Sequence, residues 1–253
     1  MAMPTNHAIL SASSSHRWLE CPPSAKLCAE LPDTSSEYAQ EGTDAHTLCE
    51  HRLKALLGRE TTDPTENLTY YNEEMERCAV EYATYAYEQV KKAKVACNDP
   101  IVLIEQKLDF SRWVPEGFGT GDCVIVADGT LSVIDFKYGK GVEVLAENNP
   151  QMMLYAFGAL ELFDGIYDIS AVNMIIFQPR RDNISEYAIS KEELLRWANE
   201  ILTPTAQLAA NGDGDFKAGK HCRFCKVRAT CRKLAEYNLS LIHISEPTRL
   251  RRI

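Results

Sequence analysis

Residues 121–137 read GDCVIVADGTLSVIDFK, and the fold prediction starts from this segment. Two β-branched runs, Gly121–Ala127 and Leu131–Lys137, flank the pair Asp128-Gly129. An Asp-Gly pair between two such runs is a strong signal for a β-hairpin, because its residues adopt the left-handed backbone of a tight turn. The sequence therefore predicts two antiparallel strands at this place.

Outside the hairpin, the spacing of apolar residues alternates between helical and extended patterns. Helices are expected within Ser11–Cys21 and over Asp44–Leu57, Asn72–Val95, Pro150–Phe163 and Lys191–Leu208, the last interrupted near Pro204; further strands are expected at Ile101–Phe110, Ala171–Gln178 and Glu186–Ile189. Helices before, between and after strands indicate an α/β fold with a mixed central sheet flanked by helices.

The composition bounds the class of protein. A length of 253 residues with 45% hydrophobic and 25% charged residues is typical of one soluble globular domain. No apolar run approaches the ~20 residues of a membrane helix, and the N-terminus lacks a secretory pattern, so we expect a cytoplasmic protein with no membrane partner. The net charge of −9 neither supports nor excludes nucleic acid, because a local basic face can coexist with an acidic remainder.

The expected organisation is a single domain over residues 1–239 with a tail behind it. The core covers about 40–210, and segments 11–30 and 212–239 form a lobe. From Ser240 the sequence SLIHISEPTRLRRI changes character abruptly and resembles a translated sequencing adaptor. We expect 240–253 to be a non-native tail and leave it out of the fold prediction.

The hairpin also predicts a charged site. The strands are antiparallel, so Asp122 at the start of one and Asp135 at the end of the next are expected close together at one edge of the sheet. Asp135 and Lys137 are two residues apart and share a face. Charged groups inside a buried strand are costly unless they are paired or bind a metal, and carboxylate oxygens suit Mg²⁺ or Mn²⁺.

Gly121-Asp122 followed by Asp135-Phe136-Lys137 resembles the signature of the PD-(D/E)XK nucleases, with Gly121 in place of the family's proline. The resemblance implies a restriction-endonuclease-like core and metal-dependent hydrolysis of phosphodiester bonds. Asp122 and Asp135 would hold Mg²⁺ or Mn²⁺ together with the backbone carbonyl of Phe136. Lys137 would activate water or stabilise the transition state.

Two further motifs are similar to those of the RecB-like exonuclease branch. Gln151 and Tyr155 fit its Q-x-x-x-Y helix motif, and Gly42–His46 looks like its G-x-x-x-H motif. The resemblance implies that His46 assists metal binding and that Gln151 and Tyr155 orient Lys137 or a DNA phosphate. Each motif alone is commonplace, but all four occur in order on the expected elements. Glu105 is a further acidic group, for which pairing on an edge strand is the favoured interpretation.

The cysteines predict a second metal centre. Cys222, Cys225 and Cys231 form C-x2-C-x5-C, and Cys21, beside two prolines, is the natural fourth ligand with Cys28 in reserve. Four thiolates suit Zn²⁺ or an iron–sulfur cluster, and the spacing does not choose between them. The resemblance to AddB-type nucleases and CRISPR-adaptation exonucleases implies a [4Fe–4S] cluster that joins the two ends of the domain; a structural Zn²⁺ is the alternative.

A basic stretch surrounds these cysteines. Residues 217–233 contain no Asp or Glu, and the residues expected to bind DNA are Lys217, Lys220, Arg223, Lys226 and Arg228. Such a row can follow a nucleic-acid backbone. Its charge would also compensate the negative charge of a thiolate cluster, and both interpretations can hold.

Together these patterns predict a DNA nuclease, in particular an exonuclease that acts on DNA with a free end. The N-terminal LSASSSHRWLECPPS looks like phage-borne members of the group, which implies a role in phage or mobile-element recombination or repair, possible recombination proteins as partners, and a bacterial or phage-infected cytoplasm. The alternative is a non-catalytic, metal-stapled module with a nuclease fold that binds DNA or a protein partner.

Overall fold

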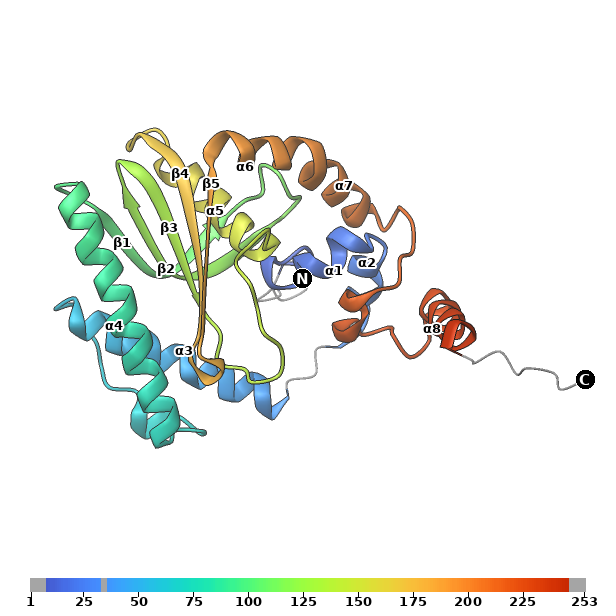
Figure 1. Ribbon diagram of the computed structural model, residues 1–253, viewed down its shortest axis with the longest axis horizontal. Coiled ribbons are helices and arrows are strands. Elements are labelled where there is room, and N and C mark those ends of the chain that lie inside the picture. Colours follow the sequence, from blue (N-terminus) through green and yellow to red (C-terminus); the bar gives the residue numbers. More distant parts are fainter. Residues whose placement is uncertain (1–7, 33–35, 246–253) are drawn as a thin grey trace, which may run out of the picture.

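The computed structural model describes residues 8–32 and 36–245 and has three layers (Figure 1). A five-stranded sheet in the order β1-β2-β3-β4-β5 lies in the middle. β3 and β4 are parallel, and the other neighbouring pairs are antiparallel. The predicted α/β class with a mixed sheet flanked by helices is confirmed.

The elements follow in the order helices, three strands, helix, two strands, helices. The helices are α1 (Ser15–Glu20), α2 (Ser24–Ala29), α3 (Glu37–Leu56), α4 (Glu73–Ala96), α5 (Pro150–Phe163), α6 (Lys191–Trp197), α7 (Thr203–Asn211) and α8 (Arg232–Ser245), with short turns η1 (Ala12–Ser14), η2 (Thr65–Asn67), η3 (Pro179–Arg181), η4 (Ala198–Leu202) and η5 (Lys220–Phe224). The strands are β1 (Ile101–Asp109), β2 (Phe118–Ala127), β3 (Gly129–Phe136), β4 (Ile169–Gln178) and β5 (Asn183–Ser190).

The predicted hairpin is β2–β3, and Gly129 takes the left-handed φ of +83° that its tight turn requires. Its first strand is longer than predicted. β2 begins at Phe118, so Asp122 lies in the middle of β2 and not at its start. Cys123 pairs with Ile134, which makes Asp122 and Asp135 the next neighbours along the two strands.

Side chains alternate across the sheet and form two cores. Cys123, Ile125 and Ile134 pack with α3 and α4 on one face. Val124 and Val133 pack with α5, α6 and α7 on the other. A sheet covered on both faces needs apolar residues at every position of its inner strands, which explains the continuous apolar runs of the sequence.

The expected helices are present with shifted ends, whereas α2 and α8 were not predicted from the sequence. Asn72 caps α4 by accepting a hydrogen bond from the amide of Met75, and α5 covers the predicted range with its proline in the first turn. α3 begins earlier than expected, at Glu37, and the interruption near Pro204 is a π-helical turn between α6 and α7. In the described part of the chain, no helix is both long and apolar enough to cross a bilayer.

Segments from the two ends of the chain lie together at one side of the sheet. α1 contacts η5, and α2 contacts α7 (Figure 1). No residue of 212–232 is buried. The tail predicted for 240–253 lies partly in α8, and 246–253 fall outside the described residues.

Candidate active site

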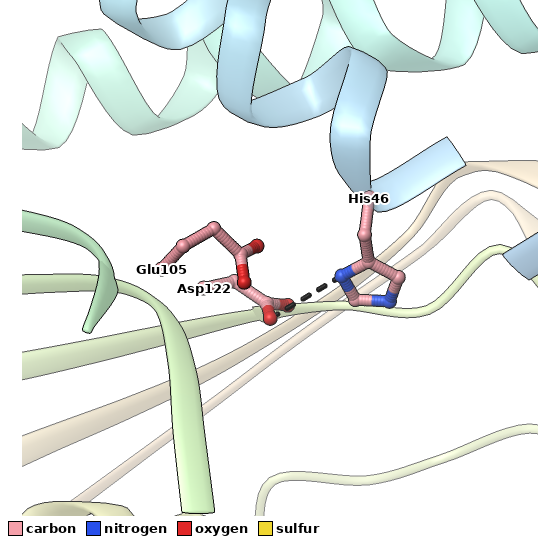
Figure 2. Close-up of side chains that lie close together, drawn as sticks. All are labelled: His46, Glu105 and Asp122. Atoms are coloured by element: carbon pink, nitrogen blue, oxygen red, sulfur yellow. Dashed lines mark ion pairs between the residues drawn. The ribbon is translucent and has the colours of Figure 1, made fainter. Parts of the chain in front are cut away.

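Three side chains from three elements converge where α3 faces β1 and β2 (Figure 2). His46 comes from α3, Glu105 from β1 and Asp122 from β2, and one nitrogen or oxygen of each lies within 4.8 Å of the other two. His46 Nδ1 is 3.3 Å from Asp122 Oδ1. An imidazole nitrogen and two carboxylates form a donor set that fits Mn²⁺ or Mg²⁺.

Glu105 reaches this group through an unusual backbone. Its φ is +49°, a left-handed value inside a strand, which costs ~1 kcal/mol or more for a residue other than glycine. Ile104 packs toward α3 and α4, whereas Leu108 packs toward α5, although regular alternation would place both on one face. The left-handed residue between them interrupts the alternation and turns Glu105 toward His46. The sequence favoured simple edge-strand pairing for Glu105, and the structure places it in the site.

Asp122 is buried and held by two partners. Its Oδ2 accepts a hydrogen bond of 2.6 Å from the amide of Phe136, and its Oδ1 faces His46. Burial raises the pKa of Asp122, but the charge and hydrogen bond of His46, the charge of Lys137 and the amide of Phe136 together outweigh burial, and the net pKa is lowered. The carboxyl is therefore an anion, oriented by β3 before any metal arrives.

Asp135 and Lys137 share a face, as predicted. Lys137 Nζ lies 2.8 Å from Asp135 Oδ2 and donates a hydrogen bond of 3.1 Å to Gln151 Oε1. Gln151 Nε2 in turn lies 3.4 Å from Asp135 Oδ1 and 3.0 Å from the hydroxyl of Tyr155. The Gln-Tyr pair on α5 thus fixes the lysine from the face opposite to His46.

The charges at the site are out of balance. Three carboxylates lie near two cations, His46 and Lys137. Burial lowers the pKa of His46, but the charge and hydrogen bond of Asp122, with the charges of Asp135 and Glu105, together raise the pKa to about 9. Burial and then Asp122 raise the pKa of Glu105 to about 7, and burial raises that of Asp135. A divalent cation would replace protons that the metal-free site retains.

The predicted metal ligands occupy two adjoining positions. His46 and Asp122 belong to the converging group, to which the structure adds Glu105. In the described chain, Asp135 is not part of that group; its carboxylate pairs with Lys137 on the neighbouring strand. For Phe136, the amide contacts Asp122, and the role of its carbonyl stays a prediction. Glu105 could have been suspected because it is the one acid inside the run IVLIEQKL.

The four cysteines of the second predicted centre come together although about 200 residues separate them. Cys21, Cys222, Cys225 and Cys231 line one small cavity, and Cys28 Sγ lies 3.8 Å from Cys225 Sγ. Sulfurs bound to a single zinc ion, each at about 2.3 Å from the metal, would all lie close to one another. Among the described residues no three thiols lie within 4.8 Å of one another. The four cysteines that line the cavity are therefore spread more widely than the ligands of one zinc ion, and Cys28, which does not line the cavity, lies beside Cys225.

The five basic residues predicted to bind DNA are all exposed. Lys220, Arg223, Lys226 and Arg228 line one groove beside the cysteines, and Lys217 lines the adjoining hollow. The structure therefore gathers them on one side of the molecule, around the cysteine cavity.

Comparison with solved structures gives distant similarities. The crystal structure of SSO0001 is 15% identical with a TM-score of 0.31, covering 74% of this chain and 95% of that one. A candidate exonuclease from Eubacterium rectale is 11% identical with a TM-score of 0.44, covering 88% of each chain. A family model described as "Protein of unknown function (DUF2800)" matches residues 7–252. The chain therefore belongs to the DUF2800 family.

Proposed function

We propose that the protein is a metal-dependent nuclease that hydrolyses phosphodiester bonds of DNA. The observation that carries the proposal is the convergence of half-buried His46 and Glu105 with buried Asp122, beside the Asp135–Lys137 pair. Two ion pairs between His46, Lys137 and two carboxylates would be complete without Glu105. A site with one carboxylate more than its cations is suited to a divalent cation. The order of motifs that resembles RecB-like nucleases adds independent support.

The residues around the metal would act in defined ways. Bound Mg²⁺ or Mn²⁺ would lower the pKa of a coordinated water and stabilise charge on a phosphoryl oxygen. His46, Glu105 and Asp122 supply the ligand atoms nearest to one another, and Asp135 is the further carboxylate. The Lys137 ammonium stabilises the developing anion, while Gln151 restricts its position and Tyr155 restricts Gln151.

The cysteine lobe forms the second part of the proposal. Cys21, Cys222, Cys225 and Cys231 would hold a [4Fe–4S] cluster, with a structural Zn²⁺ as the alternative and Cys28 as the reserve ligand. The support is physical: residues 212–232 include no buried side chain, so apolar packing does not hold this segment in place. A metal centre that joins it to α1 and α2 supplies what the missing core does not.

The proposed substrate is linear DNA with a free end, handled with recombination proteins in a phage or mobile-element setting. The experiment incubates the full chain with Mn²⁺ and either linear or circular DNA, next to an Asp135→Asn variant and an EDTA control. Cleavage of linear DNA by the parent alone, with circular DNA intact, supports the exonuclease. Binding without cleavage under Mg²⁺ and Mn²⁺, with Asp135→Asn indistinguishable from the parent, contradicts it and favours the non-catalytic module.

The cluster is tested separately by anaerobic purification. Visible absorbance and about four iron atoms per chain support the cluster, and each Cys→Ser variant should lower the iron content. A colourless protein that carries zinc contradicts the cluster and leaves the nuclease proposal intact.

A further inference from the structure

A large groove runs along the side of the molecule where the two ends of the chain meet. Its volume is about 1170 Å³, and its walls come from residues 8–17, α2, η5 and the start of α8. Figure 1 shows α1 and α2, in blue, next to the η5 region in red. These wall segments belong to the lobe that surrounds the cysteine cavity. The shape of the groove therefore depends on the structure of that lobe.

The groove is positively charged in an acidic protein. Arg17, Lys220, Arg223, Lys226 and Arg228 line it, and no Asp or Glu is among the described residues on its walls. The whole chain has a net charge of −9, so this separation of charge does not follow from composition. A concave surface of one sign concentrates polyanions, and phosphate groups are the ligands that such arginines and lysines bind.

Phe224 gives the groove a second property. Its side chain lies on the wall and is 74% exposed, and the Arg223 guanidinium lies 5.6 Å from the centre of its ring. An exposed aromatic ring beside cationic side chains offers a flat surface on which an unpaired base can stack. A base inside a duplex has both faces covered by its neighbours, so this surface suits a single strand.

Part of the groove lies near the proposed active site. Ser11, Ser14 and Val142 line it, and Val142 belongs to the loop that follows Lys137. Ala12, between the two serines, is close to the Tyr155 ring, because a Cβ added at Gly119 would lie 2.8 Å from Tyr155 and 3.4 Å from Ala12. A strand that follows the groove is thereby led toward the site.

We propose that this groove binds single-stranded DNA, with phosphates along Lys220, Arg223 and Arg228 and one base stacked on Phe224. The inference rests on the proposed function, which makes DNA the substrate. It adds that the DNA bound in the groove is single-stranded and that Phe224 selects it by stacking on an unpaired base. Loss of one stacked base corresponds to about 5- to 150-fold in affinity, and each neutralised phosphate contact changes the salt slope for a single strand by about 0.7.

The test measures anisotropy of a labelled oligo-dT strand with the full chain, purified anaerobically, without added divalent cation. Phe224→Ala and Phe224→Leu should weaken binding by about 5-fold or more, and Phe224→Trp should retain it. Arg223→Gln should lower the salt slope by about 0.7, and Lys92→Gln, at the far end of α4, should change nothing. Metal content must equal that of the parent in every variant, because Phe224 precedes Cys225.

Several results would overturn the inference. Equal affinity of Phe224→Leu and Phe224→Trp removes the stacking role, and preference for duplex over oligo-dT removes the single-strand assignment. Tighter binding of an acidic peptide than of oligo-dT assigns the groove to a protein partner instead. Cleavage is read in a separate assay, so the two proposals fail independently: loss of cleavage with Phe224-dependent binding contradicts only the nuclease, and cleavage with Phe224-independent binding contradicts only the groove.

Discussion

The site at the sheet and the cysteine lobe differ in how they are held in place. His46, Glu105 and Asp122 project from α3, β1 and β2, whose other residues fill a core shared with α4. The cysteine segment 212–232 has no buried residue and contacts the body mainly through α1. One region is therefore fixed by packing and the other by a small number of specific contacts.

The two regions should therefore differ in how far their structure depends on metal. A carboxylate site built on packed strands keeps its geometry without its ion, because the surrounding apolar contacts fix the backbone. A loop-rich lobe without a core gains its order from whatever joins its ligands. We expect metal loss to stop chemistry in the first region and to loosen structure in the second.

The largest expected effect is on the lysine of the packed region. Lys137→Ala should lower Mn²⁺-dependent cleavage by about 10²- to 10³-fold, because it removes the ammonium that we propose stabilises the developing anion. Thermal unfolding should stay cooperative. The matched control is Lys140→Ala, which removes a more exposed lysine paired with Glu74. Full cleavage activity in Lys137→Ala would contradict the catalytic role proposed for Lys137.

The added carboxylate gives the next effect. Glu105→Gln should raise the Mn²⁺ concentration needed for half-maximal cleavage by about 10- to 100-fold, since one oxygen ligand of the converging group loses its charge. Glu88→Gln, on the exposed face of α4, serves as control. If both variants need the same Mn²⁺ concentration as the parent, Glu105 is a structural residue only.

Metal removal should act selectively on the cysteine lobe. After chelation, trypsin should cut within 217–233 at least about tenfold faster, while a fragment containing β1 to β5 persists. The segment is rich in lysine and arginine, so cleavage sites are present in both states. Mass spectrometry of the fragments locates the cuts. Equal cleavage rates before and after chelation would show that the lobe needs no metal.

Metal binding at the sheet should depend on pH. A ligand imidazole must be neutral, and the pKa of His46 is about 9, because burial lowers it but the Asp122 carboxylate raises it further. Mg²⁺ affinity should therefore rise about tenfold per pH unit from pH 7.5 toward 9 and then level off. Calorimetry on the Lys137→Ala variant measures this without turnover, and a flat profile would exclude His46 as a ligand.

The smallest effect concerns the outermost hydroxyl of the lysine network. Tyr155→Phe removes the hydrogen bond with Gln151 and should lower the cleavage rate by about 2- to 10-fold, corresponding to about 0.5–1.5 kcal/mol. The single-turnover rate is the measurement, because it isolates the chemical step. A loss as large as that of Lys137→Ala would mean that Tyr155 itself contacts the substrate.

Local patterns carried most of the fold. The Asp128-Gly129 turn, the cap at Asn72 and the proline that begins α5 each act within a few residues, so the hairpin and two helices are readable from sequence. The predicted start of β2, at Gly121, was too late by several residues. Phe118 and Gly119 form part of the strand only through pairing with β1. Pairing of that kind is a property of the assembled sheet.

The candidate site divides in the same way. Asp135 and Lys137 share a face by simple alternation, and their ion pair follows from the sequence. Glu105 enters the site only through a left-handed backbone that breaks alternation, and no composition rule predicts that. The contact between Cys28 and Cys225 likewise joins two distant segments and depends on the tertiary fold.

The most direct test of the central claim follows bound Mn²⁺ and DNA cleavage in one titration. Electron paramagnetic resonance counts the bound ion while end-labelled linear DNA reports the rate. We predict that cleavage rises in step with Mn²⁺ bound at the sheet, and that Asp122→Asn loses both together. Cleavage without bound Mn²⁺, or an uncut substrate when the site is saturated, would contradict the account.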